Sequence, residues 1–203
     1  MPRHYPQTKG QLKKLVDDLD INLDDIETCF IADMSRLFKS TKRVDFSGIE
    51  TWDTSKVENM AEMFWGVKEF NADISGWDTS SVKDMRSMFS FATDFNQNIN
   101  SWNVSKVENM EAMFCGARNF NQPLNLWNVS QVKRMDEMFK GANNFNQPLD
   151  KWDASNVVKM NGMFFCAKKF DQNLDSWNVN GIMKIDKEMF KGSPLENNPP
   201  KWY

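Results

Sequence analysis

The sequence has little of the chemistry that marks catalytic or metal sites. Its only histidine, His4, stands in the N-terminal tail without a cysteine or carboxylate partner in a known motif. The three cysteines, Cys29, Cys115 and Cys166, lie at unrelated offsets and indicate neither a disulfide framework nor a metal site; they suit a reducing compartment. Because no nucleophile, paired-carboxylate or phosphate-loop motif can be assigned either, we expect no catalytic residue, no metal and no cofactor.

The sequence also lacks a basic excess and long apolar runs. The formal net charge is −3, and no run of lysine and arginine is long enough for a polyanion-binding patch, so nucleic acid is not an expected partner. No segment is apolar over the length of a membrane span. Residues 1–10 contain neither the apolar core of a secretory signal nor a lipid-attachment cysteine. As the sequence stands, we expect no membrane insertion and a cytoplasmic location.

What the sequence does have is a period of 25 residues. Such a period predicts a repeat array in which each unit is stable only through contact with its neighbours. We expect the periodic indoles to form one stacked internal column and not separate sites. Seven of the eight tryptophans obey the period: Trp52, Trp77, Trp102, Trp127, Trp152, Trp177 and Trp202.

The first part of each unit has the pattern of a short helix. Val107, Met110, Met113 and Ala117 follow spacings of three and four residues, which are typical of the apolar face of a helix. Ser105 and Glu108 form an S-x-x-E capping box at its start. Glycine stands just after the Met-Phe pair, where a left-handed residue usually closes a helix. These glycines are Gly66, Gly116, Gly141 and Gly192.

The last part of each unit has the pattern of a short strand. Trp127 and Val129 alternate with a polar residue. Stacked coils would place these strands in parallel, about 4.8 Å apart. The fold class that we predict is α/β, a right-handed leucine-rich-repeat-like solenoid with one short parallel strand and one short helix in each coil.

The two ends of the array differ from its repeats. Residues 1–25 are predicted to form an N-terminal helical cap, opened by a capping box of Thr8 and Gln11. Its apolar face comprises Leu12, Leu15, Val16 and Leu19. Residues 26–203 then hold about seven repeats, and the last carries Pro199 and Pro200, which would blunt an exposed strand edge.

The repeat units resemble those of a known family. The patterns W-[DN]-x-S-x-V-x-x-M-x-x-M-F-x-G-A and F-N-Q-x-[LI] are similar to those of the BspA-like leucine-rich repeat surface proteins, whose 25-residue variant is common in mycoplasma-type lipoproteins. The resemblance covers residues 26–202. It implies a leucine-rich-repeat-like solenoid that binds proteins or host surfaces, and a location at the cell surface.

Two polar rows follow the period. The first follows each tryptophan and either ties neighbouring coils by side-chain hydrogen bonds or presents an acidic surface to a partner. The second follows each repeating phenylalanine, and there we expect coil-to-coil bonds. The first row contains Asp53, Asp78, Asn103, Asn128, Asp153 and Asn178; the second contains Asn71, Asn96, Asn121, Asn146 and Asp171, together with Gln97, Gln122, Gln147 and Gln172.

Three aromatic residues break the period. Trp65, Phe91 and Phe165 stand just after the Met-Phe pair, where other units have serine, cysteine, lysine or glycine, and Phe91 replaces the favoured glycine. They either pack locally over a neighbouring loop or act as aromatic anchors for a partner.

These patterns predict a non-enzymatic protein–protein interaction module whose partner is another protein. The alternative is a structural or self-associating surface element without a defined ligand. An enzyme ranks third, because the repeated carboxylates alone assign no reaction.

Overall fold

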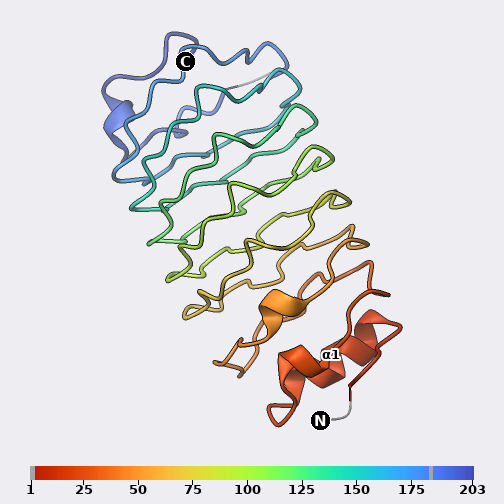
Figure 1. Cartoon of the computed structure of the whole chain (residues 1–203). Helices are drawn as coiled ribbons and strands as arrows, with labels where there is room; N and C mark the ends of the chain where they lie inside the picture. The colour runs from red at the N-terminus through yellow and green to blue at the C-terminus, as the bar shows by residue number, and fades with distance from the viewer. Residues whose placement is uncertain (1–2, 183–184) are drawn as a thin grey trace.

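The structure is a stack of coils with a helix at its N-terminal end. Figure 1 shows this arrangement in a computed structural model, with the two termini at opposite ends of the stack. The structure describes residues 3–182 and 185–203. Its regular elements are an α-helix, α1 (Lys9–Asp17), and three short 3-10 helices, η1 (Leu23–Asp25), η2 (Ile49–Thr51) and η3 (Pro194–Glu196). The expected α/β solenoid is wrong, because the described coils contain no sheet and no α-helix.

Single-residue parallel bridges, and not strands, join the coils. Asp84 pairs with Asn59 on one side and with Asn109 on the other. The strand expected at Trp127 and Val129 is wrong because the chain turns there. The N–H of Trp127 donates to a carbonyl three residues back at 3.2 Å, and the carbonyl of Val129 accepts from an N–H three residues ahead at 2.9 Å. The row of bridges also includes Asp33, Arg134 and Lys159.

The segment expected to be helical is a succession of tight turns. Ala112 lies in its middle with a φ of 53°, in the left-handed region. A right-handed helix cannot continue through such a residue, so the helix expected over residues 105–117 is wrong. The spacing of three residues reflects turns instead, as where the N–H of Met113 donates to the carbonyl of Met110 at 3.2 Å. The equivalent left-handed residues are Arg36, Glu62, Ser87, Glu137 and Gly162.

The residues expected to cap this helix make other bonds. The hydroxyl of Ser105 donates to Asn103 Oδ1 at 2.7 Å, and Glu108 accepts from the Nζ of Lys133 at 2.7 Å. The left-handed glycines after the Met-Phe pair are confirmed, although each closes a turn and not a helix. Gly66, Gly116, Gly141 and Gly192 have φ values from 65° to 75°.

Coil-to-coil hydrogen bonds replace a sheet. In one coil, the N–H groups of residues 110, 112, 114 and 116 donate to carbonyls 24 residues further along the chain, at 2.7–2.9 Å. The N–H groups of residues 113, 115 and 117 close local turns with carbonyls three residues back. Alternation of these two bond types lets the backbone turn continuously while its polar groups remain paired.

Aromatic columns fill the interior of the stack. The predicted column of indoles is confirmed: Trp77 and Trp102, for example, are buried and stack with centroids 6.4 Å apart and an interplanar angle of 4°. Each periodic indole also donates from Nε1 to a main-chain carbonyl, as Trp102 does to Ile74 at 3.0 Å. Two columns of phenylalanine run beside the indoles. The two columns contact each other within each coil, as where the ring centroids of Phe114 and Phe120 lie 4.1 Å apart. Rings of the same coil and rings of the neighbouring coils thus bury one another, so burial of a coil depends on its neighbours along the stack.

The N-terminal helix begins as predicted. Thr8 and Gln11 form the capping box of α1, and the Leu12 and Val16 side chains are buried. Leu19 was expected on the same face, but it lies beyond the end of α1 and is 56% exposed. Arg43 joins this segment to the coils by donating to the carbonyls of Val16, Asp18 and Ile21. No pattern in the sequence indicates this contact.

The last coil covers the Phe190 ring with the Tyr203 ring, whose centroid lies 5.0 Å away in an edge-on arrangement. The Tyr203 hydroxyl donates to the carbonyl of Asp186 at 2.9 Å. Pro199 and Pro200 precede this contact. Because no strand lies there, the expectation that they blunt a strand edge is also wrong.

Candidate functional site

The turn after the Met-Phe pair forms one edge of the stack. In the coil that begins at Trp52, the N–H of Val67 donates to the carbonyl of Phe64 at 3.1 Å, which places Trp65 and Gly66 at the corner of the turn. Phe91 and Phe165 occupy equivalent corners in later coils. We call this row of corners the aromatic edge. Its positions are Lys39, Ser40, Trp65, Gly66, Ser90, Phe91, Cys115, Gly116, Lys140, Gly141, Phe165, Cys166, Lys191 and Gly192.

Phe91 is held in a strained and exposed conformation. Its φ of 59° is left-handed, at a corner where four other coils have glycine, and 48% of the residue is exposed. Such a conformation costs a bulky residue about 1–3 kcal/mol. The ring packs edge-on against Trp65, with centroids 6.0 Å apart, and lies over Gly116, where a Cβ would come within 2.7 Å of its Cδ1 atom. Local packing therefore holds the ring while much of it still faces solvent.

Lysines lie over the other two aromatic rings. The Nζ of Lys39 lies 4.4 Å from the ring centroid of Trp65. Lys140 and Lys191 lie on the two sides of Phe165 along the stack, 5.5 and 6.0 Å from its ring centroid. Contacts of this kind contribute about 0.5–1 kcal/mol each at exposed sites. These lysines were not predicted, because residues 25 or 26 positions apart become neighbours only once the coils stack.

The structure brings together two of the three predicted aromatic residues. Trp65 and Phe91 are in contact, whereas Phe165 lies three coils further along the edge from Phe91. Three coils correspond to about 14 Å at the usual spacing of hydrogen-bonded chains. The aromatic edge therefore presents two clusters, and a single small ligand would not contact both.

Glu62 anchors the N-terminal end of the aromatic edge. One carboxylate oxygen accepts from Arg36 Nη2 at 2.8 Å, and the other accepts from Lys39 Nζ at 2.6 Å. The side chain is only 13% exposed. The hydrogen bond from Arg36, together with Lys39, lowers the pKa of Glu62 from 4.5 to about 2. Glu62 thereby fixes the ammonium group that lies over Trp65.

We expect the stability contributed by Glu62 to be lost as the pH falls from about 4.5 to about 2. In that interval the unfolded carboxyl binds a proton and the folded one does not, so lowering the pH favours unfolding. Glu62→Gln should remove on the order of 1–2 kcal/mol of stability at pH 7 and much less near pH 2. Urea unfolding at both pH values measures this difference. Equal losses at both pH values, or an equal pH dependence in the exposed control Glu69→Gln, would contradict the role of the ion pairs.

The acidic row after the tryptophans makes local bonds. Asp53 accepts through Oδ1 from the N–H and the hydroxyl of Ser55, at 3.0 and 2.7 Å. Side-chain and backbone hydrogen bonds from the serine two residues ahead lower the pKa of Asp53, and the same bonds lower those of Asp78 and Asp153. Asn103 and Asn128 accept from the equivalent N–H groups. Of the two alternatives for this row, coil-to-coil bonding by these side chains is therefore wrong, because each side chain closes its own turn. That the row presents an acidic surface to a partner stays a prediction.

The polar row after the phenylalanines does join the coils, as predicted. Asn96 Oδ1 accepts from the N–H of Asn121 in the next coil at 2.9 Å, and Asn121 Oδ1 accepts from the N–H of Asn146 at 2.9 Å. The Nε2 groups of Gln97, Gln122, Gln147 and Gln172 bond to the preceding coil in the same way. This row is structural.

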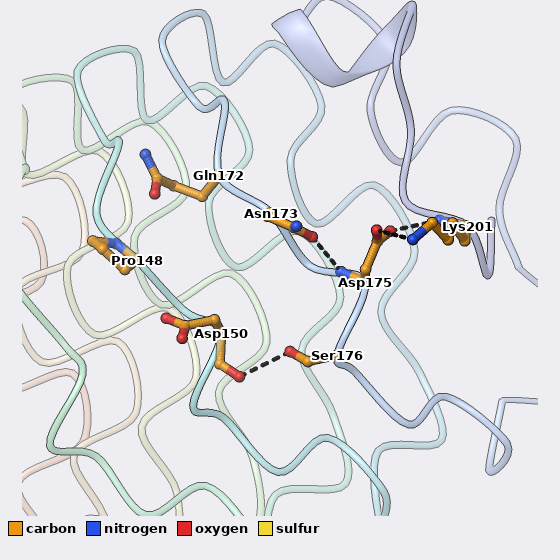
Figure 2. A pocket seen from close by; sticks show the side chains of 7 residues that line it. All are labelled: Pro148, Asp150, Gln172, Asn173, Asp175, Ser176 and Lys201. Atoms are coloured by element: carbon orange, nitrogen blue, oxygen red, sulfur yellow. Dashed lines mark hydrogen bonds and ion pairs between the residues drawn. The ribbon is translucent and has the colours of Figure 1, made fainter.

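A shallow depression of about 520 Å³ lies beside the last coils (Figure 2). Asp175 accepts from the N–H and from Nζ of Lys201, at 2.9 and 3.1 Å, and the Ser176 hydroxyl donates to the carbonyl of Asp150 at 2.9 Å. The lining lacks the aromatic and aliphatic walls typical of small-molecule sites. It comprises Pro148, Asp150, Gln172, Asn173, Asp175, Ser176 and Lys201.

The groups that often carry catalysis are dispersed. Residues 3–182 and 185–203 contain no cluster of histidine, cysteine and carboxylate side chains that could hold a metal ion. Cys115 is buried, and burial raises the pKa of its thiol, which disfavours the reactive thiolate. None of the helices in the described part of the chain has the length and apolar character needed to span a bilayer.

A family model described as "Mycoplasma protein of unknown function, DUF285" matches the chain over residues 32–143 and again over residues 97–202. The chain belongs to this family. The two DUF285 matches overlap, as expected of a tandem repeat. Neither the comparison with curated proteins nor that with solved structures gave a match.

The family assignment corrects the resemblance drawn from the repeat pattern. No BspA-like or leucine-rich repeat family was found, so that assignment is wrong, and the surface location that it implied loses its basis. The strandless coils agree with this correction, because the predicted leucine-rich-repeat-like unit contributes one strand per coil. What remains is a tandem repeat of the DUF285 type.

Proposed function

We propose that this DUF285 chain is a non-enzymatic binding module that engages another protein through its aromatic edge. The observation that carries the proposal is Phe91, a left-handed and 48% exposed phenylalanine at a corner where four other coils have glycine. Glycine at this corner would relieve a strain of about 1–3 kcal/mol, so the fold itself does not require the ring.

The neighbours of Phe91 support the same proposal. The ring of Trp65 packs against that of Phe91, with centroids 6.0 Å apart, and Lys39 lies over the Trp65 ring. Aromatic side chains that are half-buried by their own surroundings lose little conformational entropy on binding, and tryptophan is enriched among residues that dominate binding energies. The cluster around Trp65 therefore has the composition and the rigidity of an anchor for a partner.

The proposal predicts that removal of the aromatic rings abolishes binding without unfolding the stack. The variant combines Trp65→Ser, Phe91→Gly and Phe165→Ser. The glycine relieves backbone strain, and this relief offsets part of the stability that is lost with the packing contacts. Immobilised protein is incubated with an extract of cells that produce it, and retained proteins are quantified by mass spectrometry. We expect the variant to retain at least one protein about 100-fold less than the wild type does. This ratio corresponds to a loss of about 2.7 kcal/mol of binding free energy from two or three anchors.

A matched control removes exposed apolar side chains from other surfaces. Phe30, Leu126 and Val158 are 49%, 70% and 50% exposed, and each is replaced by serine. Retention of the same proteins by both triple variants would refute the proposal. Sedimentation velocity distinguishes binding of another protein from self-association. If the wild type assembles with itself and the aromatic variant does not, the bound partner is a second copy of the chain.

A further inference from the structure

A row of basic residues runs beside the aromatic edge. The turn from Val67 to Phe70 follows the Trp65 corner directly and places Lys68 at the next corner. Arg118 and Lys168 occupy the same position two and four coils further along. All three are exposed, and none forms an ion pair within the part of the chain that the structure describes. Their cationic groups are thus available to a partner.

Hydrogen bonds fix the spacing of this row from Lys68 to the coil after Arg118. The carbonyl of Lys68 accepts from the next coil at 2.9 Å, that of Thr93 at 3.0 Å and that of Arg118 at 3.1 Å. Chains joined in this way lie about 4.8 Å apart. Since the basic residues stand on alternate coils, their backbones repeat at about 9.6 Å along the edge.

This repeat matches a polyproline II segment. Such a segment has three residues per turn and a rise of 3.1 Å, so every third side chain points the same way at intervals of about 9.3 Å. In a β-strand, residues three apart point to opposite faces, and in an α-helix they rise by only about 4.5 Å. Aromatic rows are also the surfaces on which polyproline II segments dock in known recognition modes.

The charge around Phe165 favours an acidic ligand. Lys140, Lys168, Lys169 and Lys191 share this part of the edge with Glu137, Glu188 and Glu196, which gives a local charge of +1 in a chain whose net charge is −3. Glu137 and Glu188 pair with Lys140 and Lys191, so Lys168 and Lys169 remain without an acidic partner among the described ion pairs.

We infer that the partner segment bound at the aromatic edge is an acidic polyproline II stretch, with a carboxylate at every third residue and prolines against the aromatic rings. The inference rests on the proposed function and deepens it. An anionic membrane would also attract lysines, but it would not require a repeat of about 9.6 Å along one row. The spacing therefore favours a peptide.

Synthetic peptides test the inference. The probe is a fluorescent peptide of five Glu-Pro-Pro units, and its isomer carries the five glutamates in one block before the ten prolines. Fluorescence anisotropy at physiological salt measures binding to the full chain. We expect the repeated peptide to bind about tenfold more tightly, because each well-placed charge contact contributes a factor of about two to three.

Two sets of variants locate the binding. Lys68→Gln, Arg118→Gln and Lys168→Gln together should weaken binding of the Glu-Pro-Pro peptide about tenfold by the same reasoning. The control removes the same number of exposed, unpaired charges elsewhere, as Lys42→Gln, Lys106→Gln and Lys151→Gln, and should change binding less than about twofold. Circular dichroism and urea unfolding of both variants establish that the stack is intact.

Several outcomes would overturn the inference. These are equal binding of the blocked isomer, equal loss in both triple variants, absence of peptide binding, or binding only to phosphatidylserine vesicles. The proposed function fails separately, if the aromatic-edge variant retains the proteins that the wild type captures. An intact capture that depends on Trp65 and Phe91 but not on Lys68 would leave the proposed function standing and reject the acidic polyproline partner.

Discussion

Phe114→Ala should lower the free energy of unfolding by about 3–5 kcal/mol. The ring is completely buried and stacks on three other rings. Its centroid lies 4.1 Å from that of Phe120, 5.6 Å from that of Phe139 and 5.8 Å from that of Phe89. Its removal leaves a cavity between three coils whose backbones are tied together by hydrogen bonds and cannot collapse around it. Urea denaturation followed by circular dichroism measures the loss.

Phe165→Ala provides the matched control. Phe165 lies on the surface, where lysines contact it but no buried ring stacks on it. We expect it to cost less than about 1.5 kcal/mol. Similar losses in the two variants would show that the phenylalanine columns do not carry the stability of the stack.

Trp152→Leu should lower the free energy of unfolding by about 2–4 kcal/mol. The indole stacks on Trp127 at 6.3 Å and on Trp177 at 6.2 Å, and its Nε1 donates to the carbonyl of Leu124 at 3.0 Å. Leucine cannot replace either contact. The same chemical denaturation measures the effect.

Trp65→Leu is the control for this substitution. Trp65 lies outside the column of indoles, and its ring contacts Phe91 and Lys39 at the aromatic edge. We expect a cost of less than about 1 kcal/mol. A larger loss at Trp65 than at Trp152 would contradict the assignment of the periodic tryptophans to the scaffold.

The period of the tryptophans predicted the stacking of the coils but not their local structure. Apolar residues at intervals of three and four fit a helical face, and they fit consecutive three-residue turns equally well. One clue separated the two: Gly162 interrupts the Met-x-x-Met segment at a slot where an α-helix gains nothing from glycine. The equivalent positions, Ala112 and Glu137, gave no sign in sequence that their backbones are left-handed.

The candidate site was only partly predictable. Phe91 stood out because it replaces a glycine that closes a turn, and its backbone is indeed left-handed. Lys39 and Lys140 could not be assigned to the aromatic residues, because cation–π contacts depend on which coils adjoin and on side-chain geometry. The role of Asp53 was also ambiguous: its carboxylate could reach a neighbouring coil or its own turn, and it closes the turn.

The substitution Ala112→Gly tests the central claim, that the segment around the Met-x-x-Met pattern is a succession of tight turns with a left-handed residue and not a helix, more directly than any other. Relief of the left-handed conformation should raise the free energy of unfolding by about 0.5–1 kcal/mol, after the entropy cost of glycine is counted. In a helix the same substitution would lower it by about 1 kcal/mol. Urea unfolding at pH 7 should therefore show a stabilised variant, and a destabilised variant would contradict the turn structure of the coils.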